Sequence, residues 1–424
     1  MEQLTVLMAH LNRLQSVQPS WLSANRMAAL EAFALTGFPS PRDEEWQFLS
    51  ANAFSATPLD HSSPNTLTLF DPSLELPGCL TIAFVDGILQ LPLPTAVPGI
   101  EITSLQAAEA PSPELLELPE PDARHGISSL TAALAENGVV IRIKAGTQLK
   151  QPIHLIHQNT QNQGLSATRH FVLMESHSEA TIIETHSGCH ETPYHSLSMT
   201  RIQLGENASL DHYSHQSHGN QGRHFEGLYA HQAPSSRFRQ TQATLGGLIH
   251  RSDIHSYLER AAECDLQGVF LAQDRSQIDT HTRLRHAGPH ATSRDDYRGM
   301  AAGRGRGVFQ GRIIVEKGAQ KTQAEMQCRN LLLSTEAEID AKPQLEIYAD
   351  DVKCAHGLTV GQLDPGAIFY LASRGIGEEE ARQLLTFGFA NEILEKVRPE
   401  SLQQRLQQDL SVQLNRIITP ASSA

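Results

Sequence analysis

The chain has 424 residues, of which 40% are hydrophobic and 19% charged, and its formal net charge is −14. This length predicts two or three domains or one elongated repeat architecture, and the composition is that of a globular protein. The negative charge disfavours nucleic acid and anionic membranes as partners, because both present negative charge. The segment Met1–Leu7 lacks the basic and apolar regions of a signal peptide, and no apolar run is long enough to span a bilayer. We therefore expect a soluble, cytoplasmic protein.

The first part of the chain is predicted to be helical. Leucines recur at helical spacing in residues 4–14. The segment Trp21–Thr36 keeps the same spacing and ends before Gly37, a residue type that commonly follows a helix. We assign residues 1–78 to an N-terminal helical region.

Residues 79–138 are predicted to form a loop-rich connection with short strands and one helix. Asp86 and Gly87 are typical of a two-residue hairpin turn between short apolar segments. Seven prolines occur in residues 92–121, a density that indicates loops. The helix is expected at about residues 127–136.

From residue 139 to 364 almost every segment is short, β-rich and bounded by turn-forming residues. About 200 residues without a helix are compatible with a large sandwich or a solenoid of stacked strands, and irregular repetition favours the solenoid. The tripeptide Gly-Val-Phe, which begins at both Gly268 and Gly307, is weak evidence for a repeat. We expect four apolar residues of this β core to point inward: Val269, Val308, Ile314 and Leu332.

Helical spacing returns after Pro365, and residues 365–424 are assigned to a C-terminal helical domain. A first helix is expected over Gly377–Phe387, which begins with acidic residues. Further helices are expected over residues 391–397 and 400–417. Helical regions are thus predicted at both ends of the β core.

Two polar segments of the β core resemble binding sites but have simpler interpretations. Eight histidines lie between His186 and His231 without the spacing of a fixed ligand motif, and Gln- and Ser-rich neighbours favour a hydrated strand face over a metal site. The basic segment Arg294–Arg312 belongs to an acidic protein, which favours turn glycines between ion-paired arginines over RNA binding. The sequence contains no phosphate-binding loop or nucleophile elbow, so nucleotide hydrolysis and esterase chemistry are not supported.

The clearest candidate for chemistry lies in the segment Asp350–Asp364. In an extended strand, residues two apart share a face, so Cys354 and His356 project together. A thiolate beside an imidazole suits iron, zinc or an iron-sulfur species, but provides only two of about four ligands. The five cysteines are scattered and include no Cys-x-x-Cys pair. We interpret Cys354 and His356 as half of a site that a partner chain completes. Alternatively, Cys354 is an ordinary buried residue and His356 a hydrogen-bonded residue at a strand end.

This segment closely resembles the C-terminal signature of the SufB/SufD family of iron-sulfur cluster assembly proteins. The resemblance continues in Phe369–Ile376, in Gln323–Ser334 and, near the N-terminus, in Pro41–Trp46. Ala355 and Leu358 replace residues that are usual in the signature, but the cysteine and histidine are in place. The chain length and the lack of an N-terminal cysteine motif are more similar to the SufD branch of the family.

The resemblance implies a right-handed parallel β-helix between helical end domains, and a non-enzymatic subunit of a cluster assembly scaffold. It also implies two partners. One is a SufB-like paralogue, with a homodimer possible for the chain alone, and the other is a SufC-like ABC ATPase, through which alone ATP is used. The ATPase is expected to dock on Gly377–Val397, with Phe387 and Phe389 as apolar anchors and Arg374 nearby. Alternatively, both rings only seal the last coil. A transient iron or iron-sulfur cluster is expected at the interface that the cysteine and histidine share with the paralogue.

Two other functions remain compatible with parts of the sequence. Many stacked-strand proteins are enzymes that act on polysaccharides, and fold alone would permit this function. Such enzymes need carboxylates and basic residues in an open groove, whereas the distinctive residues here are a cysteine and a histidine near the end of the β core. The third possibility is a purely structural partner that positions SufB.

Overall fold

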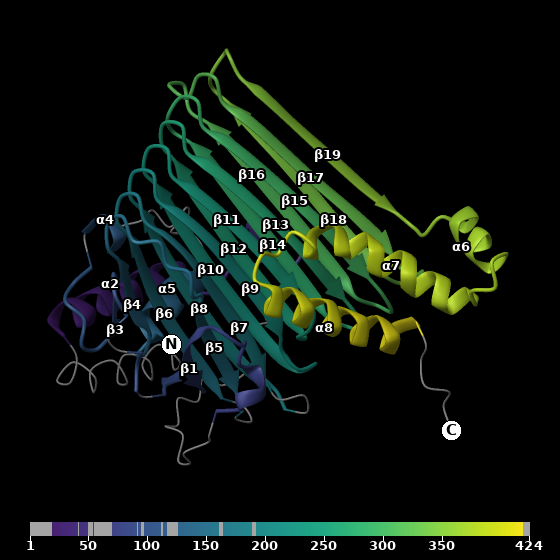
Figure 1. Cartoon of the computed structure of the whole chain (residues 1–424), viewed down its shortest axis with the longest axis horizontal. Coiled ribbons are helices and arrows are strands. Elements are labelled where there is room, and N and C mark those ends of the chain that lie inside the picture. The colour runs from purple at the N-terminus through teal and green to yellow at the C-terminus, as the bar shows by residue number, and fades with distance from the viewer. Residues whose placement is uncertain are drawn as a thin grey trace.

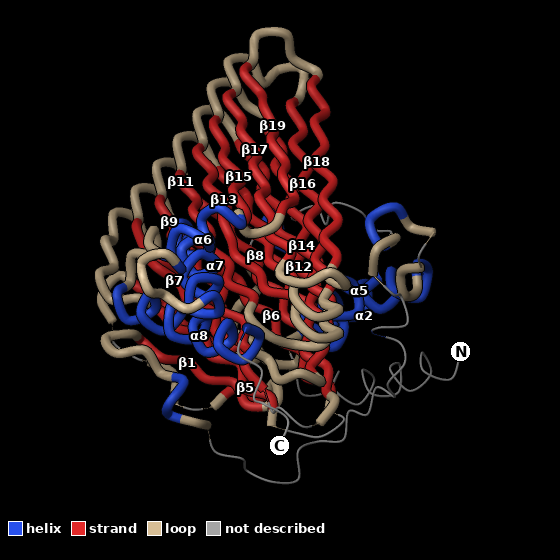
Figure 2. Tube along the Cα trace, turned by 90° about the vertical axis from the view of Figure 1, so that its right-hand side faces the viewer, coloured by secondary structure: helices blue, strands red, loops and turns tan. Residues whose placement is uncertain are grey.

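The computed structural model describes residues 19–40, 42–49, 54, 70–90, 92–94, 97–111, 113–116, 126–160, 164–188 and 192–418. Its centre is a parallel β-solenoid, in which successive strands alternate between two facing sheets, and helices lie near both ends of the chain (Figures 1 and 2). The predicted class, mainly β with a solenoid core and helical ends, is confirmed. The helix expected in residues 4–14 lies outside the described residues.

The strands form two sheets. The ten-stranded sheet contains β1 (Leu80–Val85), β2 (Ile88–Leu89), β5 (Ile153–Asn159), β7 (Glu179–Gly188), β9 (Ser209–Ser217), β11 (Arg237–Thr244), β13 (Glu263–Ala272), β15 (Thr292–Ala301), β17 (Gln323–Leu332) and β19 (Lys353–Gly361). The nine-stranded sheet contains β3 (Ile100–Ser104), β4 (Val139–Ile143), β6 (Leu165–Met174), β8 (Tyr194–Leu204), β10 (Gly222–Gln232), β12 (Ile249–Leu258), β14 (Gln277–His286), β16 (Arg306–Val315) and β18 (Glu338–Ile347). Pairing is parallel except at β1–β2 and β3–β4. Asp86 and Gly87 form the β1–β2 turn with φ of 50° and 79°, as the hairpin signal predicted.

Alternating side chains separate the interior of the solenoid from its outer faces. On β13, Phe270 belongs to the interior apolar cluster, and on β16 Phe309 does so. Three of the four residues that were expected to point inward alternate with these interior residues and lie on outer faces: Val269, Val308 and Ile314. Those three predictions were wrong, because apolar residues also occur on the outer faces, where α7 and α8 cover Val269. Leu332 packs against the interior cluster as expected.

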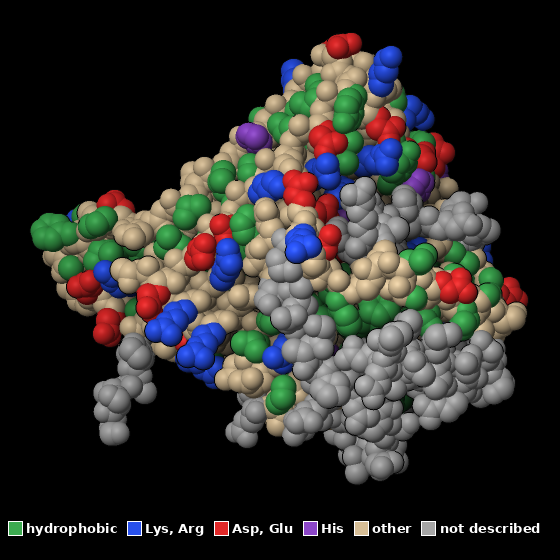
Figure 3. Space-filling view, turned by 180° about the vertical axis from the view of Figure 1, so that it is seen from behind, with side chains coloured by type: hydrophobic (Ala, Val, Ile, Leu, Met, Phe, Trp, Pro, Cys, Tyr) green, Lys and Arg blue, Asp and Glu red, His purple; other side chains and the backbone are tan. Residues whose placement is uncertain are grey.

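The C-terminal helices are α6 (Pro365–Ala372), α7 (Glu378–Leu394) and α8 (Glu400–Ile418). Residues of α7 and α8 pack on the outer face of the ten-stranded sheet, where they bury Val269 and Leu271. The separate helix expected over residues 391–397 is mostly the last part of α7, which continues through Gly388 because one helical glycine costs only about 1 kcal/mol. Hydrophobic side chains gather at the outer tip near α6 (Figure 3). None of the described helices is long and apolar enough to cross a membrane.

The N-terminal helices pack on the other sheet. α2 (Ser20–Thr36) and α5 (Gly126–Leu134) contact each other, and α5 contacts β6 and β8 of the nine-stranded sheet. They form one apolar cluster with residues of that sheet. The helix expected at residues 127–136 is therefore confirmed. The other short helical segments are η1 (Glu44–Trp46), η2 (Pro72–Leu74) and α4 (Pro113–Leu116).

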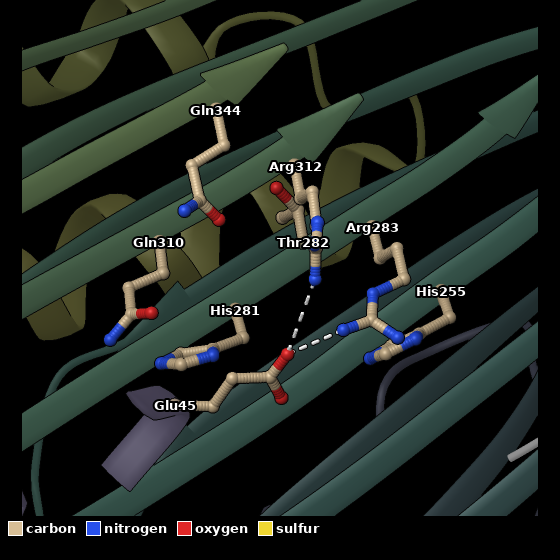
Figure 4. Close-up of a pocket in the computed structure, with 8 residues that line it drawn as sticks. All are labelled: Glu45, His255, His281, Thr282, Arg283, Gln310, Arg312 and Gln344. Carbon is tan, nitrogen blue, oxygen red and sulfur yellow. Dashed lines mark hydrogen bonds and ion pairs between the residues drawn. The ribbon is translucent and has the colours of Figure 1, made fainter. Parts of the chain in front are cut away.

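The acidic turn that contains η1 is fixed to the outer face of the nine-stranded sheet. Trp46 is 1% exposed, and the guanidinium carbon of Arg251 lies 4.3 Å from its ring centroid. Glu45 forms ion pairs with Arg283 and Arg312 at the small cavity drawn in Figure 4. The turn thus attaches the N-terminal region to the middle of the solenoid.

Candidate functional site

At the C-terminal end of the solenoid, the last strand of each sheet has one free edge. β19 pairs only with β17, and β18 pairs only with β16. No element lies beyond β19 in Figure 1. Edge strands of this kind present free backbone N–H and C=O groups to another chain. The solenoid can therefore be continued at this edge by stacking on a partner.

Cys354 and His356, which we call the edge pair, lie on the side of β19 that faces the interior. In the register with β17, Cys354 is opposite Ala324 and His356 is opposite Met326, and both of these residues belong to the interior cluster. Cys354 is half-buried and packs against that cluster, whereas His356 is exposed. The structure thus places the predicted pair on one face of one strand, at the open edge.

Apolar residues continue the same row along β19. Leu358 and Val360 follow the edge pair at two-residue spacing and are 40% and 45% exposed. Large apolar side chains that lie exposed in a row are typical of a surface that a partner covers. A chain that stacks on β19 would bury this row and approach the edge pair.

Cys354 and His356 differ in how readily each side chain can bind a metal ion. Burial raises the pKa of the Cys354 thiol, and a backbone hydrogen bond with Ala324 opposes this shift. Metals bind the thiolate rather than the thiol, so Cys354 ionises more readily when a cation is nearby. The imidazole of His356 is exposed, so it can share a metal ion with a ligand from another chain.

The other described cysteines do not complete the edge pair. Cys264 and Cys328 are buried in the interior cluster, and burial raises the pKa of Cys328 to about 12. Cys79 is half-buried against the apolar cluster beneath the C-terminal helices, and Cys189 lies outside the described residues. Within the described part of the chain, the edge pair has no third ligand of its own, since the single group of three candidate ligands lies elsewhere.

The residues expected to bind the ATPase lie on or before α7. The Phe387 and Phe389 rings are half-buried against the apolar cluster beneath α7 and α8, and the Arg298 guanidinium lies 5.9 Å from the Phe389 ring. The Arg374 guanidinium lies 4.9 Å from the ring of Tyr370. Sequence reasoning missed the more exposed apolar side chains of this end, which are Phe369 (76%), Tyr370 (55%) and Leu384 (49%).

A cleft separates α6 from the last coils of the solenoid. It encloses about 520 Å³ and is lined mostly by apolar side chains from the end of β17, the segment after β19 and α6, among them Leu333, Leu363, Ile368 and Phe369. The exposed surface of α6 and this cleft form one largely apolar region, and Glu378 and Arg382 of α7 line the cleft as well. From the sequence, the candidates at this end were Phe387, Phe389 and Arg374, and the apolar side chains of α6 were not among them.

The histidines between His186 and His231 are mostly buried rather than hydrated. Six of them are at most 2% exposed: His186, His195, His212, His215, His218 and His224. His231 is half-buried, and His190 lies outside the described residues. The predicted hydrated face was wrong, because in a solenoid one face of each strand lines the interior and helices cover part of the other. Polar neighbours such as Gln216 are therefore buried with the histidines.

The basic segment has the structure that the sequence predicted. Gly303 occupies a turn with φ of 62°, and Arg304 pairs with Glu336 at 3.1 Å. Arg306 pairs with Asp340 at 2.7 Å. These arginines are neutralised within the chain, and RNA binding gains no support.

Together these features define a stacked-strand protein with candidate metal ligands and apolar residues at an open end. The profile of the SufBD core domain of the SUF system for FeS cluster assembly matches residues 156–389, from β5 into α7. The chain belongs to the SufBD family of iron-sulfur cluster assembly proteins.

Named relatives agree with this assignment. The chain is 30% identical to an iron-sulfur cluster assembly SufBD family protein of Synechocystis, over 93% of this chain and 91% of that protein. It is 29% identical to the iron-sulfur cluster assembly protein SufD of Escherichia coli, over 89% of each chain. It is 24% identical to SufD of Bacillus subtilis, over 92% of this chain and 93% of that protein.

Proposed function

We propose that this protein is a non-enzymatic subunit of a cytoplasmic iron-sulfur cluster assembly scaffold. It pairs with a SufB-like paralogue and a SufC-like ABC ATPase, and supports iron acquisition, cluster formation and cluster transfer. The observation that carries the proposal is the open edge of β19, where Cys354 and His356 stand in a row with exposed apolar residues. Membership of the SufBD family supports the role in cluster assembly.

Iron or a cluster is the cargo of this site, held transiently between two chains. Two ligands do not saturate a tetrahedral iron, so the paralogue supplies the others. An incomplete site suits transfer, because a cluster held by few local ligands leaves more easily than one in a closed four-cysteine site.

The SufC-like ATPase hydrolyses the ATP that cluster assembly uses, because this sequence has no phosphate-binding loop of its own. The proposed docking surface is the start of α7 with the neighbouring apolar surface of α6. Exposed aromatic side chains in such a region, at the rim of a cleft, are typical anchors of a protein interface.

Two alternatives have less support. A polysaccharide enzyme is compatible with a parallel solenoid, but the family membership favours cluster assembly. A purely structural partner would stack on the SufB-like chain through the same open edge, and Cys354 and His356 would bind no metal. A Cys354→Ala, His356→Ala double variant that still supports full cluster formation would favour this structural role.

The proposal is tested by coexpression of this chain with the SufB-like and SufC-like proteins of the same organism, followed by anaerobic purification and iron and sulfide analysis. We expect the three chains to copurify and to carry iron and sulfide. The same preparation without this chain should carry less of both. Equal cluster content with and without this chain would refute the proposal.

A further inference from the structure

A second group of candidate ligands lies inside the solenoid. His157 on β5, and Glu184 and His186 on β7, are at most 4% exposed, and their ligand atoms lie within 4.8 Å of one another. We call these three residues the interior group. In the ten-stranded sheet β7 is six strands away from β19, and six spacings of about 4.8 Å place the group about 29 Å from that strand. The interior group is therefore separate from the edge pair.

The ligand atoms of the interior group have no hydrogen-bond partners. This holds for His157 Nε2, for Glu184 Oε2 and for both ring nitrogens of His186, all of which are fully buried. The Glu184 Oε2 atom lies 3.9 Å from His157 Nε2 and 3.7 Å from His186 Nε2. Buried polar atoms are nearly always paired, so several unpaired atoms that converge on one place indicate that something occupies it.

Neighbouring residues hold these ligands in their orientation. Thr200 Oγ1 donates a hydrogen bond of 2.6 Å to Glu184 Oε1, and His212 Nε2 lies 3.0 Å from the same oxygen. Both contacts leave Glu184 Oε2 free to face the two histidines. His157 Nδ1 lies 3.4 Å from Thr168 Oγ1, which leaves its Nε2 free as well. Outer contacts of this kind orient the ligands of protein metal sites.

A fourth candidate ligand comes from the opposite sheet. His224 on β10 lies with its ring centroid 4.6 Å from that of His186, and its Nε2 is also unpaired. Its Nδ1 lies 3.1 Å from the carbonyl oxygen of Ser196, which can only accept. The proton of the neutral ring is therefore on Nδ1, and Nε2 carries a lone pair toward the interior.

We propose that His157, Glu184 and His186 bind one divalent transition-metal ion, zinc or ferrous iron, in the interior of the solenoid. Two imidazoles and one carboxylate are a ligand set that both ions accept. Bonds of about 2.1 Å in a tetrahedron separate two ligands by about 3.4 Å, so small side-chain shifts close the present spacing around an ion. The Glu184 carboxylate offsets part of the charge, and His224, which lies outside the group within 4.8 Å, becomes the fourth ligand if its side chain shifts toward the ion.

The ion would tie together two coils and both sheets near the N-terminal end of the solenoid. Because the ligands are enclosed, the ion enters as the chain folds and exchanges slowly afterwards. An ion bound only by the folded state also raises the free energy of unfolding.

The test uses Co²⁺, a spectroscopic substitute for both ions. The full chain is produced without its partners in medium supplemented with Co²⁺, and metal per chain and visible absorption are measured. We expect about one ion per chain with d–d bands, and no thiolate charge-transfer band once Cys354 and His356 are replaced by Ala, because no cysteine is a ligand of the interior group. Glu184→Gln and His186→Gln should each lower the metal content about tenfold.

Two control variants separate this site from others. His286→Gln replaces an equally buried histidine whose Nε2 lies 2.8 Å from Ser293 Oγ, and it should keep the ion. The Cys354→Ala, His356→Ala double variant should keep it as well, so the interior site and the edge pair succeed or fail independently.

Three outcomes would overturn the proposal: wild-type protein without stoichiometric metal, which would mean that the unpaired atoms bind only water; unchanged metal content in both interior variants; or a thiolate charge-transfer band that persists in the Cys354→Ala, His356→Ala double variant. If the variants do not fold, the metal content and absorption of the wild-type chain decide the question.

Discussion

At the scale of single residues, Arg251 connects the N-terminal region to the solenoid. Its side chain is fully buried, with Nε 2.7 Å from Asp253 Oδ1 and Nη1 2.8 Å from Asp279 Oδ2. The guanidinium also lies over the Trp46 ring and donates a hydrogen bond of 2.8 Å to the carbonyl oxygen of Glu45. One side chain thus satisfies two buried carboxylates and fixes the acidic turn.

We expect Arg251→Met to lower the free energy of unfolding by about 3–5 kcal/mol, because it removes the guanidinium that pairs with two buried carboxylates. Arg304→Met is the matched control, since Arg304 and Glu336 are 62% and 65% exposed and such pairs contribute about 1 kcal/mol or less. Urea unfolding followed by circular dichroism measures both variants. Equal losses in the two variants would contradict this account of Arg251.

The edge pair and the buried histidines differ in how far their positions can be predicted from the sequence. The common face of Cys354 and His356 follows from the two-residue period of a strand, and the sequence was sufficient to predict it. The burial of His186 does not follow from the sequence, because polar residues beside a histidine usually indicate solvent. Only the closed cross-section of the solenoid shows that these polar side chains face one another.

At the scale of elements, the C-terminal helices have two distinct sides. The side toward the ten-stranded sheet buries Ile393 and Leu402 together with Val269 and Leu271 of β13. Removal of all residues after Arg374 would therefore uncover an apolar sheet face as well as remove the proposed docking surface. Substitutions on the exposed side test docking without this complication.

We expect the double variant Phe369→Ser, Leu384→Ser to weaken capture of the SufC-like ATPase by at least about tenfold, as loss of interface anchors does. Its thermal unfolding should be unchanged, because the two side chains are 76% and 49% exposed. The control is Val412→Ser on α8, which is 42% exposed and lies outside the proposed surface. Pull-down with the purified ATPase measures capture, and undiminished capture by the double variant would place the docking surface elsewhere.

The turns between strands explain why the repeat is difficult to see in the sequence. Non-glycine residues occupy the left-handed conformation at successive turns, including Asn207 (φ 58°), Ser235 (60°), Ala261 (56°) and Lys321 (64°). A glycine at each of these positions would have produced a periodic signal. The Gly-Val-Phe tripeptides were misleading instead, since Gly268 is on β13 of one sheet and Gly307 on β16 of the other. Strand content was thus predictable, whereas the length of a coil was not.

At the scale of the whole molecule, buried histidines make stability depend on pH. Burial lowers the pKa of His154 and His255 to about 3, and that of His195 and His286 to about 4. Burial also lowers the pKa of six further histidines: His157, His170, His186, His218, His224 and His250. Histidines of the unfolded chain titrate near pH 6.5, so below that pH the unfolded state binds more protons and the free energy of unfolding falls.

Two buried carboxyl groups act in the opposite direction. Burial raises the pKa of Glu226 and of Asp295 to about 7. As the pH falls, both groups are protonated first in the folded state, which raises the free energy of unfolding. Ten histidines outnumber two carboxyls, so on balance the free energy of unfolding falls as the pH drops below about 6.5.

We therefore expect the isolated chain to lose stability as the pH drops below about 6.5 and to unfold before pH 4 is reached. Circular dichroism and tryptophan fluorescence, measured from pH 8 down to pH 3, follow the transition. His286→Gln removes one of the histidines and should move the midpoint to lower pH. A folded wild-type chain at pH 4 would contradict the prediction.

The central claim of this account is that the open end of the solenoid carries half of a metal site. The most direct measurement is the iron content of the complex assembled anaerobically with the His356→Ala variant, beside a Thr359→Ala control on the opposite face of β19. Because His356 is exposed and packs little, we expect the variant complex to assemble normally and its iron content to fall severalfold, while the control keeps its iron. An intact His356→Ala complex with unchanged iron content would contradict the claim.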